Sequence, residues 1–111
     1  MKRTPLFEQH QQLGGKLVDF AGWEMPIQYG GVIEEYQAVR TAAGLFDVSH
    51  MGRVTADGRE AEAFLQRVTT NNVAKLAVGD AQYSMVCNPA GGIKDDIFIY
   101  RLGQTRFLVC V

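Results

Sequence analysis

The sequence has few of the features that mark a secreted, membrane-spanning or nucleic-acid-binding protein. It contains two cysteines and three prolines in 111 residues, and no apolar run is long enough to span a membrane. The N-terminal Lys2-Arg3 pair is not followed by the apolar segment of a signal peptide. Neither sign of charge dominates, because 11 basic residues are balanced by 12 acidic ones. These shortages argue against a secreted disulfide scaffold, a membrane protein and a nucleic-acid-binding tract.

The two cysteines, Cys87 and Cys110, stand alone in apolar, strand-like stretches without CxxC spacing. We therefore expect buried free thiols, which suit a reducing compartment, and predict a cytoplasmic protein. The two histidines, His10 and His50, have no ligand-like spacing to cysteine or aspartate, so no metal site is predicted. With 47% hydrophobic and 21% charged residues, the chain has an ordinary globular composition. Its length allows one compact domain or pieces of two.

The chain opens with a helical pattern. Thr4-Pro5 is a favourable start, with threonine as N-cap and proline in the first turn, and Gly14-Gly15 is a favourable end. The apolar side of this helix is predicted to carry Leu6, His10 and Leu13. A histidine on such a side is more often a hydrogen-bonded packing residue than a catalyst, so we assign His10 to packing.

A tryptophan-bearing stretch, residues 16–29, is interpreted as a loop, and residues 32–43 are predicted to form a second amphipathic helix that ends at the following glycine. The next stretch contains Asp47, Ser49 and His50, which are the residue types of a hydrolytic triad. Triad members come from separate segments, and no nucleophile elbow is present here. We therefore reject a triad.

From about residue 52 the predicted order is strand, helix, strand, strand, strand. Strands are expected near residue 54 and at 81–87, 93–100 and 104–111, and the helix has an apolar stripe of Ala61, Phe64, Leu65 and Val68. This order predicts an α+β fold, a mostly antiparallel sheet with helices on one face. The last strand has no turn or polar tail after it, so we expect an open edge that could self-associate, in a chain cut from a longer protein.

The most informative stretch is residues 91–100, where two glycines precede an alternating strand with two adjacent carboxylates. Successive strand residues face opposite ways, so the two acids cannot share a face. Asp95 falls at the rim of a face of isoleucines, whereas Asp96 shares its face with Phe98 and Tyr100. A carboxylate in line with two flat rings suits a cleft for a planar heterocycle. From this stretch alone, the alternative is a pair of acids that only solvate a turn.

Several blocks of sequence follow one another along the chain: TPL at 4–6, DFAGWEMP at 19–26, AVR at 38–40, FDVSHMG at 46–52, YS at 83–84 and GGIKDD at 91–96. Together they resemble the N-terminal part of aminomethyltransferase, the T-protein of the glycine cleavage system. The resemblance runs through essentially the whole chain. Its departures are small: Asn72 stands where many relatives carry aspartate, and Lys94 fills a usually apolar position.

The resemblance implies a folate enzyme. T-proteins take the aminomethyl group carried on the dihydrolipoyl arm of the H-protein and pass its carbon to tetrahydrofolate, so that ammonia leaves and methylenetetrahydrofolate forms. The family's chain is longer and has three domains around a central folate cavity. By analogy, residues 1–51 would be the first piece of domain one and residues 52–111 most of domain two, with domain three absent. Such a fragment alone is expected to be inactive.

The resemblance also implies roles for individual residues. The family's catalytic carboxylate is the second acid of the GGxxDD block, which is Asp96 here, and this residue would also contact folate. Met51, Tyr83, Phe98 and Tyr100 match other folate-contacting positions. Asp96 would hold the reduced folate so that N5 meets the aminomethyl carbon, and would stabilise positive charge as ammonia departs. The implied partners are the lipoylated H-protein and tetrahydrofolate.

Two alternatives remain open. The chain could be a folate-binding module of a larger oxidase or dehydrogenase of methylated glycines, whose folate domains resemble T-proteins. The start at Met1, three residues before the TPL block, favours a stand-alone enzyme instead. The chain could also be a non-catalytic relative that keeps the fold, although the presence of both Asp95 and Asp96 argues against this.

Overall fold

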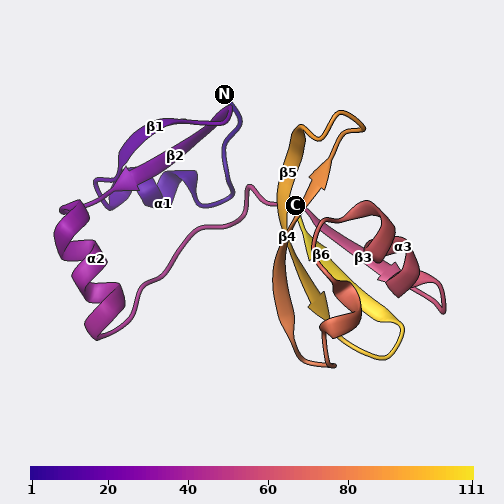
Figure 1. Ribbon diagram of the computed structural model, residues 1–111. Coiled ribbons are helices and arrows are strands. Elements are labelled where there is room, and N and C mark those ends of the chain that lie inside the picture. The colour runs from indigo at the N-terminus through magenta and orange to yellow at the C-terminus, as the bar shows by residue number, and fades with distance from the viewer. The chain divides into compact units, whose positions relative to one another are not determined.

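The computed structural model describes residues 1–111 and shows two compact units, Met1–His50 and Met51–Val111. Each unit contains its own sheet, one of two strands and one of four (Figure 1). No helix in either unit has the length and apolar character needed to cross a membrane. The two units are described separately below.

The first unit is built around a β-hairpin, where the sequence had predicted a loop. Its elements are α1 (Phe7–Gln12), β1 (Lys16–Phe20), β2 (Trp23–Gln28) and α2 (Val32–Thr41). The two turn residues, Ala21 and Gly22, both have positive φ angles, 50° and 85°, as a tight two-residue hairpin turn requires. The Asp19 carboxylate accepts the N–H of Gly22 at 2.8 Å. The loop prediction was wrong because alanine is an unusual residue at such a turn and Pro26 is unusual within a strand.

Helix α1 begins later than predicted and buries a different side. The Thr4 side chain does not cap it; instead the Thr4 carbonyl accepts the N–H of Phe7 at 3.1 Å in the preceding turn. Phe7 and His10 are buried, whereas Leu13 is 71% exposed. Of the predicted stripe, His10 is buried but Leu6 and Leu13 are exposed, and Phe7 is buried in their place.

Helix α2 has the predicted apolar stripe, but no residue of it is buried. Val32, Tyr36 and Val39 are 43–62% exposed. Together with β2 and residues 43–47 they line an open groove of about 610 Å³. The helix ends at Thr41, before the predicted glycine at position 44.

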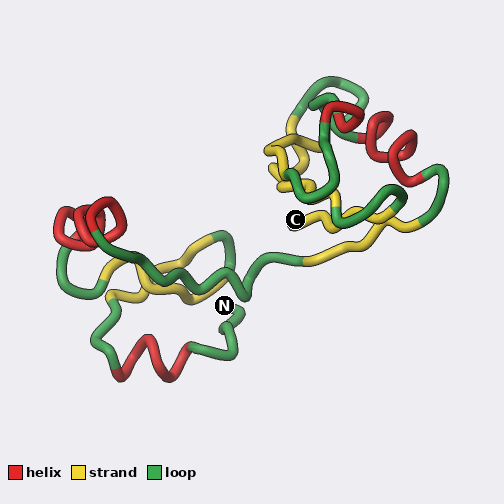
Figure 2. Tube along the Cα trace, turned by 90° about the horizontal axis from the view of Figure 1, so that it is seen from below, coloured by secondary structure: helices red, strands yellow, loops and turns green.

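The second unit confirms the predicted α+β fold with an antiparallel sheet. Its elements are β3 (Arg53–Asp57), α3 (Ala61–Val68), the 3-10 helix η1 (Val73–Lys75), β4 (Ala81–Cys87), β5 (Ile93–Arg101) and β6 (Arg106–Cys110). The strands lie in the order β3-β6-β5-β4, and every neighbouring pair is antiparallel. Figure 2 shows both helical segments of this unit on the same side of the strands.

Strand β6 is an interior strand, so the expectation of an open C-terminal edge was wrong. It pairs with β3 on one side and with β5 on the other. Phe107 is fully buried and Val109 is 6% exposed. The last strand in the sequence lies inside the sheet because it is inserted between β5 and β3, the first strand of the unit. The reason given for self-association through this strand is thereby removed.

The core of the second unit lies between the sheet and its helical segments. The core consists of eight buried residues. Ala61 and Leu65 of α3 pack there with Val73 of η1, with Leu76 just after η1, and with four strand residues: Ile97, Ile99, Phe107 and Val109. Phe64, at 58% exposed, and Val68, at 38%, lie outside this core, so only half of the predicted helix stripe is buried. The isoleucine face of β5 is therefore the core face, as its alternation predicts.

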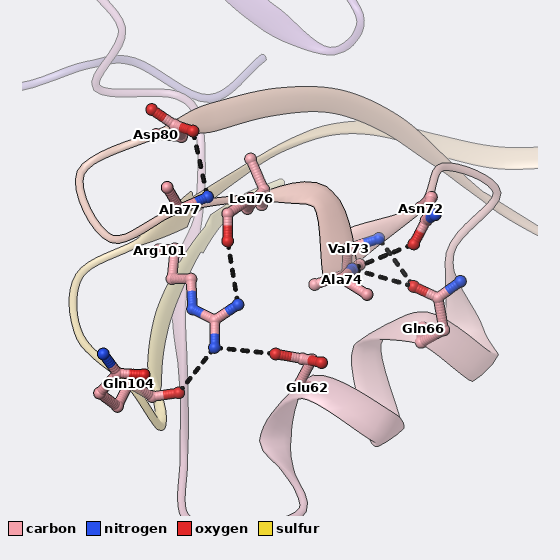
Figure 3. A network of polar contacts seen from close by, with 10 residues as sticks. All are labelled: Glu62, Gln66, Asn72, Val73, Ala74, Leu76, Ala77, Asp80, Arg101 and Gln104. Carbon is pink, nitrogen blue, oxygen red and sulfur yellow. Dashed lines mark hydrogen bonds and ion pairs between the residues drawn. The ribbon is translucent and has the colours of Figure 1, made fainter.

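A set of polar contacts fixes the helical segments to the end of β5 (Figure 3). The Arg101 guanidinium donates to the carbonyl oxygens of Leu76 at 2.9 Å and Gln104 at 3.0 Å, and it pairs with Glu62 of α3 at 2.8 Å. The Gln66 side chain of α3 accepts the N–H of Val73 at 2.7 Å. These contacts, with the core, hold α3 and η1 on one face and leave the opposite face of the sheet uncovered within this unit.

Candidate functional site

The uncovered face of the four-stranded sheet carries a carboxylate and three aromatic rings. Strand β5 presents Asp96, Phe98 and Tyr100 on this face, and β4 presents Tyr83 beside them. Tyr83 is the register partner of Phe98. The structure therefore brings together four of the five residues predicted for the folate site, in one cluster on two neighbouring strands.

The members of this cluster are in contact but remain accessible. The Tyr83 hydroxyl donates a hydrogen bond to Asp96 Oδ2 at 3.0 Å. The rings of Tyr83 and Phe98 lie 5.5 Å apart at 60°, and those of Phe98 and Tyr100 lie 6.2 Å apart at 33°. The three aromatic residues are 46%, 42% and 37% exposed in chain order. We call these four residues, Tyr83, Asp96, Phe98 and Tyr100, the aromatic–carboxylate cluster.

The electrostatics of the cluster centre on its hydrogen bond. The bond to Asp96, followed by partial burial and by the negative charge of Asp96, raises the pKa of Tyr83 above the usual value of 10.0. A phenol that titrates later stays protonated longer, so Tyr83 remains a donor across the neutral and mildly alkaline range.

The other acid, Asp95, lies away from the cluster. It is exposed, is paired across the sheet with Val86, and makes no side-chain hydrogen bond or ion pair. The register shifts between Val86 and Cys87, so that Cys87 pairs with Ile93 and Lys94 is left without a partner. This irregularity explains why Ile93, which strict alternation places in the core, is 65% exposed.

The fifth predicted residue, Met51, lies outside the cluster. It is half-buried and precedes β3, which is separated from β5 by β6. Its carbonyl oxygen receives a long contact of 3.4 Å from the Arg53 guanidinium. Within this chain, Met51 and the aromatic–carboxylate cluster are on the same unit, and no side-chain hydrogen bond joins them.

The register places further residues on this face that sequence reasoning did not select, among them Met85 beside Asp96. Cys110 pairs with Phe98, and Leu108 pairs with Tyr100, so both lie beside the aromatic rings. Both cysteines are free and half-buried, and the expectation of buried thiols was therefore wrong. The alternation of β6 could have placed Cys110 opposite the core, but its position next to Phe98 depends on strand order, which sequence periodicity does not contain.

The cluster has the features of a site for a planar heterocycle. Flat, half-exposed rings offer stacking surfaces for a planar heterocycle, and a carboxylate accepts hydrogen bonds from ring N–H groups. Asp96 has one oxygen engaged by Tyr83 and no other side-chain partner, so acceptor capacity remains for a ligand. The groove in the first unit also has aromatic and acidic residues in its lining, but both acids are already engaged: Asp47 pairs with His10, and Glu35 accepts the N–H of Tyr29.

The first unit contains a buried hydrogen-bonded chain instead of a triad. One ring nitrogen of His10 lies 2.7 Å from Asp47 Oδ2, and the other lies 2.7 Å from the Tyr29 hydroxyl. Asp47 also accepts the backbone N–H of Ser49 at 2.9 Å. His10 is thus the hydrogen-bonded packing residue that was predicted. His50 packs against the Phe20 ring, at 5.5 Å, and takes no part in this chain.

Comparison with known proteins assigns the chain to a family. The model of the GCVT N-terminal domain matches residues 6–111, so the chain belongs to this family. The fold agrees with that assignment. The structure is similar to that of the glycine cleavage system aminomethyltransferase T from Bartonella henselae, with a TM-score of 0.86 and 40% identity over 98% of this chain and 30% of that chain.

Curated relatives carry the name aminomethyltransferase. The chain is 55% identical over 111 residues to the protein of Desulfitobacterium hafniense (strain DSM 10664 / DCB-2), covering 100% of this chain and 30% of that protein. It is 51% identical over 111 residues to the protein of Bacillus subtilis (strain 168), again over 100% of this chain and 31% of that protein. The chain thus spans less than a third of the length of these relatives.

Proposed function

We propose that this chain is part of a tetrahydrofolate-dependent aminomethyltransferase of a glycine cleavage system. In the proposed reaction, the methylene carbon of an aminomethyl group on the dihydrolipoyl arm of the H-protein passes to tetrahydrofolate. The carbon–sulfur bond breaks and leaves the dihydrolipoyl thiol, ammonia is released, and 5,10-methylenetetrahydrofolate forms. The observation that carries this proposal is the aromatic–carboxylate cluster, on an open sheet face within the residues matched by the family.

Each member of the cluster has a role in the proposal. The rings of Tyr83, Phe98 and Tyr100 hold the flat part of the folate, and Met51 contributes a further apolar contact. Tetrahydrofolate supplies the nucleophilic nitrogens that accept the carbon. Asp96 orients the ligand and provides a fixed negative charge near the carbon as ammonia leaves. Placement and electrostatic stabilisation are the two largest contributions that a protein makes to such a transfer.

The remaining assignments follow the same analogy. Residues 1–51 would belong to the first domain of the complete enzyme and residues 52–111 to its second. The partners would be the lipoylated H-protein and tetrahydrofolate. A cytoplasmic location is supported by the two free cysteines, Cys87 and Cys110, which suit a reducing compartment.

The test uses the complete protein that contains residues 1–111. It is incubated with aminomethylated H-protein and tetrahydrofolate, and ammonia and methylenetetrahydrofolate are both measured. We expect the two products in equal amounts and only when both substrates are present. H-protein with an unmodified lipoyl arm is the control. Binding of tetrahydrofolate without any transfer would contradict the enzymatic proposal and favour a non-catalytic relative.

A further inference from the structure

The contact between Tyr83 and Asp96 crosses the sheet diagonally. Tyr83 pairs with Phe98, and Asp96 pairs with Met85, so the two residues are not direct register partners. Diagonal neighbours lie about 7–8 Å apart at their backbones, which a long side chain such as tyrosine can bridge. The hydroxyl reaches Asp96 Oδ2 at 3.0 Å. The bond therefore depends on the length and direction of the tyrosine side chain.

Tyr83 is held in this direction by its surroundings. Its ring packs against Phe98 at 5.5 Å, and Phe98 is in turn next to Tyr100. From the other side, the Asn71 side chain donates to the Tyr83 carbonyl oxygen at 2.9 Å. The adjacent residue, Ser84, is buried and its hydroxyl accepts the N–H of Asn71 at 3.0 Å. Both the backbone and the ring of Tyr83 are thus restrained, although its side chain borders solvent.

Asp96, in contrast, is held by Tyr83 alone. It is exposed and makes no other side-chain hydrogen bond or ion pair. An exposed carboxylate without partners rotates freely, and fixing it on ligand binding costs conformational entropy. A single hydrogen bond to Oδ2 removes much of that freedom and leaves Oδ1 available.

We propose that Tyr83 is a positioning residue, whose hydroxyl holds the Asp96 carboxylate in one orientation and presents Oδ1 to the bound folate. This inference rests on the proposed function and adds to it a role for the phenol that is separate from ring stacking. Because the bond to Asp96 raises the pKa of Tyr83 above 10.0, the phenol is protonated and can donate at neutral pH.

Variants of the complete protein separate the hydroxyl from the ring. Tyr83→Phe keeps the ring and removes the donor, whereas Tyr83→Leu removes both. We expect Tyr83→Phe to lower kcat by roughly 10- to 100-fold, the effect of one hydrogen bond to a charged group, with less than about a threefold change in the Kd of tetrahydrofolate measured by calorimetry. Tyr83→Leu should in addition weaken that Kd by about tenfold.

A double-mutant cycle shows whether Tyr83 acts through Asp96. In an Asp96→Asn background, Tyr83→Phe should change kcat by less than about twofold, because the group that it positions is already lost. Equal effects of Tyr83→Phe in both backgrounds would overturn the proposal. So would a Tyr83→Phe variant with the kcat of the unaltered protein.

A titration without folate tests the contact independently of activity. Tyrosinate absorbance is followed with rising pH for the unaltered protein, Tyr83→Phe and Asp96→Asn. The difference between the unaltered protein and Tyr83→Phe isolates Tyr83, which should titrate above its usual pKa, and the same difference in the Asp96→Asn background should show a lower pKa. A Tyr83 that titrates identically with and without the Asp96 carboxylate would overturn the proposal. If the Tyr83 pKa depends on the Asp96 carboxylate but the unaltered protein shows no aminomethyl transfer, the result would count against the proposed function alone.

Discussion

At the scale of single residues, the two adjacent acids of β5 differ because they face opposite sides of the sheet. Asp96 belongs to the aromatic–carboxylate cluster, whereas Asp95 is exposed and has no hydrogen-bond partner. One interpretation of the sequence was that the two acids solvate the adjoining turn, which would give Asp95 a contact there. No such contact is present, so its removal should be close to neutral for folding.

This contrast gives a direct prediction for the complete protein. Asp96→Asn should lower the transfer rate by roughly 30- to 1000-fold, because it removes roughly 2–4 kcal/mol of transition-state stabilisation, and should hardly change the melting temperature. Asp95→Asn should change the free energy of unfolding by less than about 0.5 kcal/mol and leave the rate intact. Rates and melting curves of both variants decide the matter. An inactive Asp95→Asn beside an active Asp96→Asn would reverse the assignment.

Asp47 has the strongest electrostatic signature in the first unit. Burial alone would raise its pKa, but hydrogen bonds from Ser49 and His10 outweigh burial and hold the pKa well below the usual 3.8. Its side chain is only 4% exposed. A lowered pKa in the folded state means that the unfolded state binds more protons at acidic pH. The resulting stabilisation is complete above about pH 4 and is lost as the pH falls further.

We therefore expect Asp47→Asn to lower the free energy of unfolding of the first unit by about 1–3 kcal/mol at neutral pH, and to flatten its decline below about pH 4. Urea unfolding followed by the fluorescence of Trp23, the single tryptophan, reports on this unit. Glu8→Gln, which alters an exposed acid, serves as the matched control. Equal acid sensitivity in Asp47→Asn and the unaltered chain would refute this account.

At the scale of elements, the site face of the second unit exists because other contacts hold the helices on the opposite face. Arg101, at the end of β5, has a side chain only 12% exposed and joins α3, the segment after η1 and the β5–β6 turn. We call these contacts of Arg101 with Glu62, Leu76 and Gln104 the polar clamp. Strand β5 thus carries the aromatic–carboxylate cluster on one face and the polar clamp at its end.

Arg101→Met should lower the free energy of unfolding of the second unit by about 2–3 kcal/mol, since two carbonyl groups and Glu62 lose their partner. Arg101→Lys should recover part of this loss, because an ammonium group cannot reproduce the planar fork of contacts. Hydrogen exchange of the β5 amides measures both. Arg106→Met is the control, because Arg106 is 61% exposed in its ion pair with Asp57 and should contribute less than about 0.5 kcal/mol. Similar losses for Arg101→Met and Arg106→Met would be inconsistent with a structural clamp.

At the scale of the whole molecule, residues 1–111 span only 30% of the length of the Desulfitobacterium hafniense relative. The aromatic–carboxylate cluster covers one side of a flat ligand at most, because it lies on a single sheet face. The apolar stripe of α2 is likewise uncovered within the first unit.

Residues 1–111 alone are therefore expected to transfer aminomethyl groups at less than about a thousandth of the rate of the complete protein. Precise placement of two reactants contributes many orders of magnitude to such a reaction, and half of a site supplies little of it. Transfer by the purified residues 1–111 and by the complete protein is compared at equal concentration. Comparable rates would show that the four residues of the cluster suffice.

Features whose physical cause lies within a few residues could be predicted from the sequence. Alternation placed Asp96, Phe98 and Tyr100 on one face of β5, and the strand at 81–87 was predicted at its observed bounds, because successive strand residues face opposite sides whatever surrounds them. His10 was assigned correctly to packing from its position on an apolar helix side. The order of elements in the second unit was sufficient for its α+β class.

Which segments meet could not be predicted, because it depends on contacts between distant parts of the chain. The pairing of β6 with both β3 and β5, the bond from Tyr83 to Asp96, and the link from His10 to Asp47 all join residues that are distant in sequence. The hairpin at Ala21-Gly22 escaped prediction because its positive φ angles are imposed by strand pairing on a residue that rarely adopts them. Periodicity specifies the face on which a side chain lies, but strand order and register, which depend on long-range packing, specify its neighbours.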